Sequence, residues 1–266
     1  MKQLNITFLL VVLMSITANK ASAHDIEVKN DDGVTIYYNF INDNTELEVT
    51  YQGTYANEYS NEYTGKVVIP SSVNYNGKTY TVTSIRYYAF HNCSGLTSVE
   101  ISESVKSIDY YAFQNCSSLT SVTIPNSVTI IELGTFRNCT GLTSVTIGNS
   151  VTSIVDLAFS GCSSLTSVTM QTKNPVKITS GVFTNRANAT LYVPQGCKDA
   201  YKAADYWKEF KEIKEGLPTG VKAVENSQTT ENLETSNWYT LDGRRLSGKS
   251  TSRGIYIVNG RKIVVK

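Results

Sequence analysis

Apolar residues recur through the middle of the chain at a constant step of 23 positions. Each unit opens with an isoleucine, and a phenylalanine, a cysteine and a leucine follow in that order. The four complete copies are Ile85-Phe90-Cys93-Leu96, Ile108-Phe113-Cys116-Leu119, Ile131-Phe136-Cys139-Leu142 and Ile154-Phe159-Cys162-Leu165. Such sameness is needed where side chains share an interior, so the pattern predicts stacked coils that bury their apolar sides against one another.

Within one unit the pattern predicts a strand, a bend and a turn of helix. Valine and isoleucine alternate with serine and threonine over residues 121–124, which is the pattern of a half-buried strand. A bend follows at Pro125, and a second short extended piece at residues 128–131. Between residues 108 and 119 the apolar positions recur about every four residues, which predicts a helical turn beginning near Asp109.

Degenerate copies of the unit mark both ends of the predicted stack. Residues 68–73 repeat the strand and bend of later units, so the solenoid is predicted to begin near Gly65. An insertion in this first coil carries Asn76–Gly77, a dipeptide that favours a tight hairpin turn. Residues 191–194 are the last predicted strand, which gives a solenoid over residues 65–194.

The flanking segments predict caps. Residues 24–64 are rich in tyrosine and alternate in places, which predicts a small β cap that seals the stack rather than a separate ligand site. In residues 195–215 apolar positions lie three apart, a step that drifts by about 60° around a helix, so two short helices meeting near Asp205 fit better than one. They would cover the other open end.

Residues 1–23 have the pattern of a secretory signal. Lys2 supplies the positive start, residues 6–17 a short apolar run, and residues 21–23 a small-residue cleavage site. The mature chain is therefore expected to begin at His24. No later segment has the roughly 20 apolar residues that a membrane helix needs.

The repeat resembles the leucine-rich repeats of the BspA-like family, whose unit reads roughly Ile-x-x-x-Ala-Phe-x-x-Cys-x-x-Leu-x-x-Val-x-Ile-Pro-x-x-Val. Ala89–Phe90, Ala112–Phe113 and Ala158–Phe159 match this unit, whereas Thr135–Phe136 departs from it. The resemblance covers about residues 65–215. It implies an α/β solenoid of leucine-rich repeats and a role in adhesion, including attachment to extracellular matrix proteins.

The end of the chain is predicted to form a separate module. Residues 216–237 are polar and read as a linker. Residues 238–266 contain extended runs with hairpin signals at Asp242–Gly243 and Asn259–Gly260. This module is similar to the C-terminal sorting domains of type IX secretion in Bacteroidetes, which implies delivery across the outer membrane to the cell surface; a plain terminal β module is the alternative.

Charge and composition exclude several kinds of partner and chemistry. Without Lys2 and Lys20 of the leader, 22 basic residues face 23 acidic ones, which disfavours binding to nucleic acid. The sequence has no phosphate-binding loop and no Gly-x-Ser-x-Gly elbow. Ligands spaced by 23 residues do not make a metal cluster. We therefore expect no cofactor and no metal.

The repeated cysteines invite a catalytic or disulfide interpretation, which their positions disfavour. They occupy an inward position and project in parallel, so we expect buried free thiols. His91 precedes Cys93 by two residues, but its equivalents are Gln114, Arg137 and Ser160. Because a catalytic dyad needs convergent groups, we expect no enzyme. Three Asn-x-Ser/Thr triplets recur with the repeat, and glycosylation of them is not expected.

Two surfaces remain as candidates for recognition. One is a ribbon of polar side chains on the outer face of the strands: Ser98, Glu100, Ser121, Thr123, Ser144 and Thr146. The other is the pair of tyrosine turns, in which Arg86-Tyr87-Tyr88 is expected to stack beside Asp109-Tyr110-Tyr111. The structural alternative is that one tyrosine of each pair packs on its neighbour to complete the turn.

The sequence thus predicts an exported, non-enzymatic scaffold that presents an extended surface at the cell exterior. The expected partner is a matrix or surface protein. A glycan is the alternative, in which case the chain would serve polysaccharide use. We expect a monomer.

Overall fold

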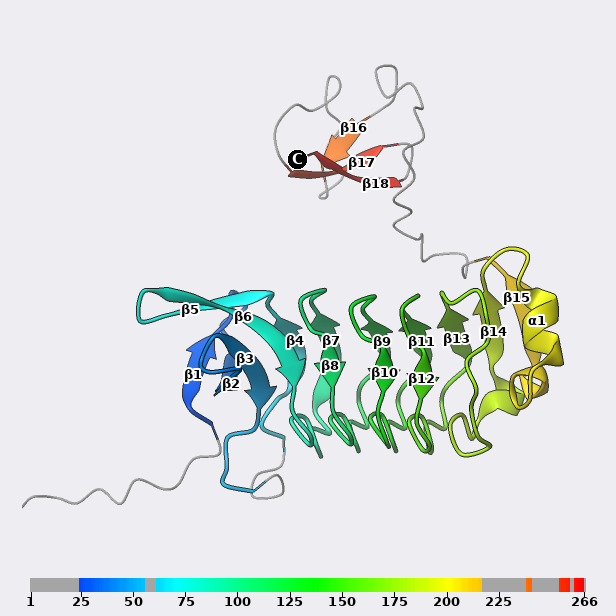
Figure 1. The fold of residues 1–266 in the computed structure, drawn as a ribbon, viewed down its shortest axis with the longest axis horizontal. Helices are drawn as coiled ribbons and strands as arrows, with labels where there is room; N and C mark the ends of the chain where they lie inside the picture. The colour runs from blue at the N-terminus through cyan, green and yellow to red at the C-terminus, as the bar shows by residue number, and fades with distance from the viewer. Residues whose placement is uncertain (1–23, 56–60, 217–237, 241–253, 259–260, 266) are drawn as a thin grey trace, which may run out of the picture.

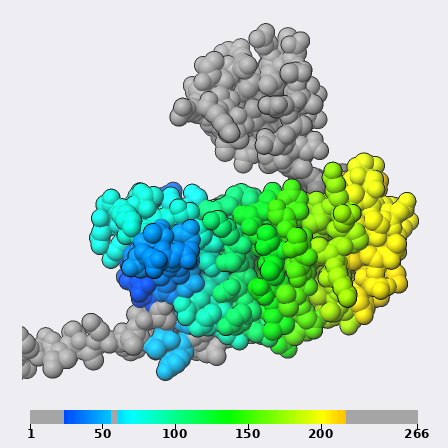
Figure 2. Space-filling view, in the orientation of Figure 1, coloured from blue at the N-terminus to red at the C-terminus, as the bar shows by residue number. Residues whose placement is uncertain are grey.

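The computed structural model describes residues 24–55, 61–216, 238–240, 254–258 and 261–265. The predicted signal and nearly all of the predicted linker lie outside these residues. Between residues 65 and 215 the chain forms successive coils that stack side by side in sequence order (Figure 1). The predicted repeat architecture is therefore confirmed. In space-filling view the coils follow one another without a break from the cyan to the yellow end (Figure 2).

A row of parallel strands runs along one face of the stack. Its register is kept at 23 residues, as in Ser121↔Ser144↔Ser167. It comprises a two-stranded sheet, β4–β7, and a five-stranded sheet in the order β15-β14-β13-β11-β9. The strands are β4 Gly65–Ile69, β7 Leu96–Ile101, β9 Ser121–Ile124, β11 Ser144–Ile147, β13 Ser167–Met170, β14 Thr190–Val193 and β15 Glu212–Glu215.

A second row of very short strands runs along the stack and joins the N-terminal sheet. It consists of β8 Ser107–Ile108, β10 Ile130–Ile131 and β12 Ser153–Ile154. β10 pairs with β12, and β8 pairs with the last residues of β6, which spans Lys78–Ile85. The middle coils thus contribute one strand to each row and enclose an apolar interior.

The N-terminal end is closed by a mixed sheet in the order β1-β2-β3-β6-β5. Its strands are β1 Ile26–Lys29, β2 Thr35–Ile41, β3 Glu46–Thr50, β5 Ser72–Tyr75 and β6 Lys78–Ile85. The insertion in the first coil forms the β5–β6 hairpin, which turns at Asn76–Gly77 and belongs to this sheet. Because β3 pairs in parallel with β6, the sheet continues into the second strand row of the solenoid.

The interior contains a column of stacked phenylalanines. Their ring centroids lie 4.7 to 5.3 Å apart and the rings are within 9° of parallel. The column is Phe90, Phe113, Phe136, Phe159 and Phe183. Tyr63 contacts its first ring, and Trp207 and Phe210 contact its last. Both ends of the column are therefore covered by aromatic side chains.

The repeated cysteines form a second interior column and are free thiols, as predicted. Three of these thiols donate to a phenylalanine carbonyl of the preceding coil: Cys116 Sγ lies 3.1 Å from the oxygen of Phe90, Cys139 Sγ lies 3.0 Å from that of Phe113, and Cys162 Sγ lies 3.2 Å from that of Phe136. A small side chain with a weak donor fits this position, because it fills the interior and satisfies a backbone acceptor.

The predicted helical turn near Asp109 is wrong, and so is the α component of the predicted α/β class within the repeats. Residues 109–119 form successive turns, with bonds such as Ala112 N to Asp109 O and Cys116 N to Phe113 O. Two positions in each unit have positive φ and stop a helix: Tyr88, Tyr111, Gly134 and Leu157 at one, and Asn92, Asn115, Asn138 and Gly161 at the other. The fold is mostly β with few helices.

The C-terminal end differs from the prediction of two helices after a last strand at 191–194. One helix forms, α1 Lys198–Ala203, followed by a 3₁₀ turn at Trp207–Glu209. Ile213 lies on β15 and pairs with Leu191 of β14. An extra strand is favoured here because it satisfies the backbone groups along the edge of β14.

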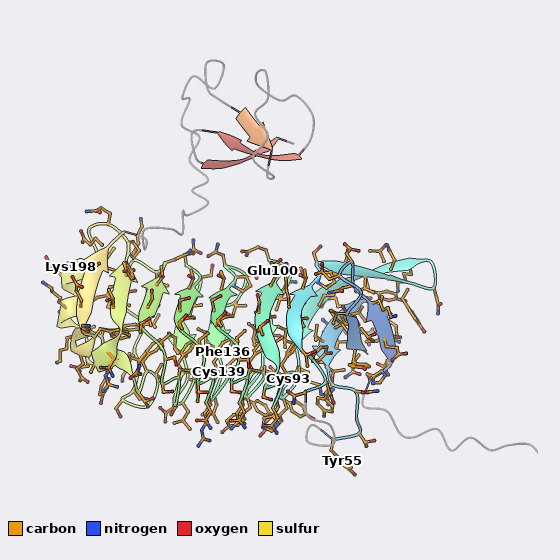
Figure 3. The ribbon with its side chains drawn as sticks, turned by 180° about the vertical axis from the view of Figure 1, so that it is seen from behind. Tyr55, Cys93, Glu100, Phe136, Cys139 and Lys198 are labelled. Carbon is orange, nitrogen blue, oxygen red and sulfur yellow. The ribbon has the colours of Figure 1, made fainter. Side chains whose placement is uncertain are left out.

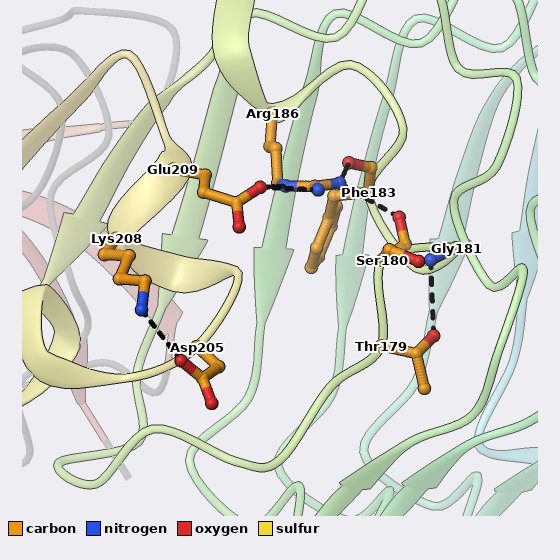
Figure 4. Close-up of polar contacts among 8 residues, drawn as sticks. All are labelled: Thr179, Ser180, Gly181, Phe183, Arg186, Asp205, Lys208 and Glu209. Atoms are coloured by element: carbon orange, nitrogen blue, oxygen red, sulfur yellow. Dashed lines mark hydrogen bonds and ion pairs between the residues drawn. The ribbon is translucent and has the colours of Figure 1, made fainter.

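Arg186 fixes this end of the stack, at the position where the repeat loses its cysteine (Figure 4). Its guanidinium bonds to Glu209 at 2.6 and 2.8 Å and to the carbonyls of Ser180 and Phe183, each at 2.9 Å. A second 3₁₀ turn, Arg186–Asn188, begins at this residue. The ion pair between Arg186 and Glu209 therefore connects the last turn of the solenoid to the segment that caps it.

The described part of the C-terminal module is a three-stranded antiparallel sheet in the order β16-β17-β18. Its strands are β16 Trp238–Thr240, β17 Gly254–Val258 and β18 Arg261–Val265. Both predicted hairpin signals of this module lie outside the described residues. In the described part of the chain, no helix is long and apolar enough to cross a membrane.

Candidate recognition surfaces

The four tyrosines of the tyrosine turns form two stacked pairs across adjacent coils. Tyr87 stacks on Tyr110 with centroids 5.3 Å apart, and Tyr88 stacks on Tyr111 at 5.4 Å, both within 7° of parallel. The pairs meet edge to face, since Tyr88 and Tyr110 lie 6.1 Å apart at 85°. Stacking therefore follows the coil spacing, as it does for the phenylalanines inside.

The tyrosines differ in how much surface they leave to a partner. Tyr110 is 43% exposed, whereas Tyr87, Tyr88 and Tyr111 are half-buried. Tyr88 and Tyr111 both have positive φ, a conformation that costs a bulky residue about 1–2 kcal/mol. Tyr87, Tyr88 and Tyr111 thus pack mainly against their neighbours, and Tyr110 is the tyrosine that a partner can reach.

Arg86 joins the tyrosine turns to the N-terminal sheet. Its guanidinium lies 2.8 Å from Glu48 Oε1, donates to the Tyr87 hydroxyl at 3.0 Å, and lies over the Tyr87 ring. The hydrogen bond from Arg86 lowers the pKa of Tyr87 below its ordinary value. Arg86 and Tyr87 thus hold the cluster in place, and Arg86 is an anchor within the fold.

In the two following coils, the repeat position of Arg86 is occupied by carboxylates. Asp109 and Glu132 occupy this position one and two units later, and both are half-buried. Burial, and then the negative charges of Glu48 and Glu132, raise the pKa of Asp109 above its usual range. A cation beside Tyr110 would be favoured by the carboxylates at these two positions.

The polar ribbon follows the strand row, as its period predicts. Ser121 and Thr123 are exposed, and Ser98, Ser144 and Thr146 are half-buried. Glu100 forms an exposed ion pair with Lys66 at 2.8 Å. In Figure 3 Glu100 lies near the upper edge of the stack, and Cys93 and Cys139, which precede their strands, lie lower. A flat row of hydroxyls lacks the aromatic anchors that usually carry affinity.

The structure gives a physical reason why Cys93 is a poor nucleophile. The residue is 1% exposed, and burial raises the pKa of its thiol to about 12. A thiol with this pKa carries little thiolate at neutral pH. His91 instead contacts the ring of Tyr88, with centroids 5.0 Å apart. Within the described residues, no three His, Cys, Asp or Glu side chains are grouped to hold a metal ion.

The structure has a third candidate surface, which the sequence patterns did not predict. Asn92, Asn115 and Asn138 form an amide ladder along the turns, in which Asn115 Nδ2 donates to Asn92 at 2.8 Å and Asn138 Nδ2 donates to Asn115 at 3.2 Å. These are the asparagines of the recurring Asn-x-Ser/Thr triplets. Their step of 23 residues was the available signal, because it places the three amides side by side.

These features define a leucine-rich repeat scaffold with an apolar interior, whose candidate recognition residues lie on its surface. Residues 55–190 match the BspA type leucine-rich repeat region in six copies. The chain belongs to this family of repeat scaffolds. No curated protein matches the chain.

Several solved structures are similar to this chain, among them two leucine-rich repeat proteins. A leucine-rich repeat protein of T. pallidum is 21% identical over 67% of this chain and 78% of its own length, with a TM-score of 0.43. A leucine-rich repeat protein of Bacteroides capillosus is 26% identical over 55% of this chain and 99% of its own, with a TM-score of 0.44.

Proposed function

We propose that this chain is an exported, non-enzymatic scaffold that uses the tyrosine turns to bind a protein partner at the cell surface. The observation that carries the proposal is the exposure of Tyr110 on a stack of half-buried tyrosines. A side chain held by its neighbours loses little conformational entropy on binding. Tyr110 would therefore be the anchor of the contact.

The charges beside Tyr110 suggest the chemistry of the partner. Asp109 and Glu132 lie along the same edge, and Arg86 shows that a guanidinium fits over a tyrosine ring of this cluster at 4.6 Å. An arginine or lysine of the partner would meet an aromatic face and a carboxylate together. The partner surface is thus proposed to be basic.

Export is supported by the two ends of the sequence. Residues 1–23 have the pattern of a secretory signal, and residues 238–266 resemble a type IX sorting domain. Adhesion to an extracellular matrix protein is the role that family membership favours. Fusion of residues 217–266 to an exported reporter in a bacterium with type IX secretion should carry the reporter to the cell exterior, and retention in the periplasm would contradict the sorting role.

Binding can be tested with the full chain and a panel of immobilised extracellular matrix proteins. We expect at least one to bind, and Tyr110→Ala to weaken that binding about tenfold or more, as for an aromatic anchor. Asp109→Asn should weaken it less and reduce its dependence on salt. Tyr55→Ala is the matched control, because Tyr55 is 74% exposed and lies outside the cluster (Figure 3).

Two results would overturn the proposal: no matrix protein binds the full chain, or the Tyr110→Ala variant binds a matrix protein as tightly as the Tyr55→Ala variant does. Melting temperatures of both variants should equal that of the parent protein, which separates a loss of contact from a loss of fold.

A further inference from the structure

The amide ladder lines a shallow open groove of about 580 Å³ along the turns. The described residues that line it all carry an amide or a hydroxyl: Asn61, Asn92, Ser94, Asn115, Ser117, Asn138 and Thr140. Among the residues that the structure describes, no charged or aromatic side chain lines the groove. A site of this composition offers hydrogen bonds without charge, which suits a neutral polar ligand.

The ladder leaves hydrogen-bonding capacity on each amide. Asn115 uses one N–H to bond Asn92 and one acceptor position to receive the bond from Asn138. A side-chain amide has two donors and two acceptor positions, so one of each remains for a ligand. The ladder also fixes the amide orientation, which reduces the entropy lost on binding.

Each coil repeats the same pair of groups. Asn92 is followed two residues later by Ser94, Asn115 by Ser117, and Asn138 by Thr140. Adjacent coils are spaced as the phenylalanine column is, by 4.7 to 5.3 Å. An extended ligand along the groove thus meets one amide and one hydroxyl per coil.

This spacing discriminates between classes of polymer. An extended peptide advances about 3.3 Å per residue, and its side chains on one face recur every second residue, so its groups fall out of step with the coils. A pyranose unit in an extended glycan is about as long as one coil is high, so the units stay in step with the coils even where successive units alternate in orientation. A nucleic acid strand would need cations, which the groove lacks.

We propose that the groove binds an uncharged, extended glycan, with one sugar unit per coil hydrogen-bonded to the paired amide and hydroxyl. The site is separate from the tyrosine turns and does not rest on the function proposed for them. Its open form favours a polymer chain, since single sugars would gain too few contacts there. Affinity should therefore rise with glycan length until the groove is filled.

The probes are uncharged oligosaccharides of increasing length, from di- to hexasaccharide, of the cello-, xylo-, manno- and malto- series. Calorimetric titration of the full chain should show binding to at least one series that strengthens with length. Asn115→Gly should weaken it about tenfold, because the central amide of the ladder is lost. Glycine keeps the local backbone, since Gly161 occupies the equivalent position with φ +74°.

Two further variants make the result specific. Asn126→Ala removes an exposed amide at the opposite ends of the strands and should bind glycan as the parent does. Tyr110→Ala should also keep glycan binding, so failure at one surface is distinguished from failure at the other. The proposal is overturned if no oligosaccharide series binds, if Asn115→Gly binds like Asn126→Ala, or if Asn115→Gly instead abolishes binding of a matrix protein.

Discussion

Tyr111 lies directly against Gly134 in the next coil, so closely that a Cβ on this glycine would fall 2.3 Å from Tyr111 Cε1. Gly134 also has a φ of +58°. A glycine is therefore required at the end of the tyrosine stack for two reasons: it adopts the positive φ, and it leaves room for the Tyr111 ring.

Replacing Gly134 by alanine should be costly for two separate reasons. The positive φ costs about 1–2 kcal/mol in any L-residue, and the contact with the Tyr111 ring adds about 1–3 kcal/mol of overpacking. Gly77→Ala is the matched control, because Gly77 has φ +77° and no atom within 4 Å of the added Cβ. Denaturant unfolding of both variants checks this, and equal losses would show that the ring makes room without cost.

Removing a ring from the phenylalanine column should destabilise the whole stack. Phe113→Ala is expected to lower the free energy of unfolding by about 3–5 kcal/mol, because the residue is fully buried between two stacked rings. Phe113→Leu should lose less, since it keeps most of the volume. A melting temperature of Phe113→Ala equal to that of the parent protein would contradict this position in the core.

Arg186→Ala should loosen the C-terminal end. The change removes the ion pair with Glu209 and two bonds to backbone carbonyls, and we expect a loss of about 1–3 kcal/mol. Lys208→Ala removes the neighbouring exposed pair with Asp205 and should leave stability unchanged. Hydrogen exchange of β15 amides would locate the effect, and exchange rates there that match those of the parent would refute it.

Stability should fall in alkaline solution because of the buried thiols. Burial raises the pKa of Cys93 from 9.0 to about 12, so the folded state holds a proton that the unfolded state releases. The resulting stabilisation is complete below pH 9 and is lost between pH 9 and pH 12, at up to about 1.4 kcal/mol per pH unit for each such thiol.

The same thiol provides the check. Cys93→Ala should show a shallower fall in unfolding free energy between pH 8.5 and about 10.5 than the parent protein, whatever its absolute stability. Cys197→Ala is a suitable control, because Cys197 is only half-buried. Parallel pH curves for Cys93→Ala and the parent would rule out this contribution.

The interior of the solenoid could be predicted because each position is repeated. The inward placement of Phe113 and Cys116 followed from copies at a constant step, and neighbouring coils in the structure use these copies as mutual partners. The turns could not be predicted in the same way. Successive turns bury residues at intervals close to those of a helix, and the positive φ at Tyr111 is signalled only by Gly134 in the same position of the next unit.

The ends and the recognition surfaces were harder to predict for a different reason. β15 has no copy elsewhere in the chain, so its residues showed only apolar spacing, and pairing with β14 decided its structure. The tyrosine turns were found because aromatic residues stand out on a polar surface. The amide ladder was not, because asparagine in a turn already has a local explanation in its tolerance of positive φ.

Because neighbouring coils make the same contacts throughout the stack, the number of coils can change without any change in the residues that cap either end. Deleting residues 140–162, one full period, would join Cys139 to Ser163 and bring Phe136 opposite Phe183, with a ring-on-ring contact of the kind that Phe159 makes now. The tyrosine turns and the aromatic plugs at both ends would be untouched. Removing or adding whole coils would therefore shorten or lengthen the molecule in fixed steps, each about as high as one ring-to-ring contact of the phenylalanine column.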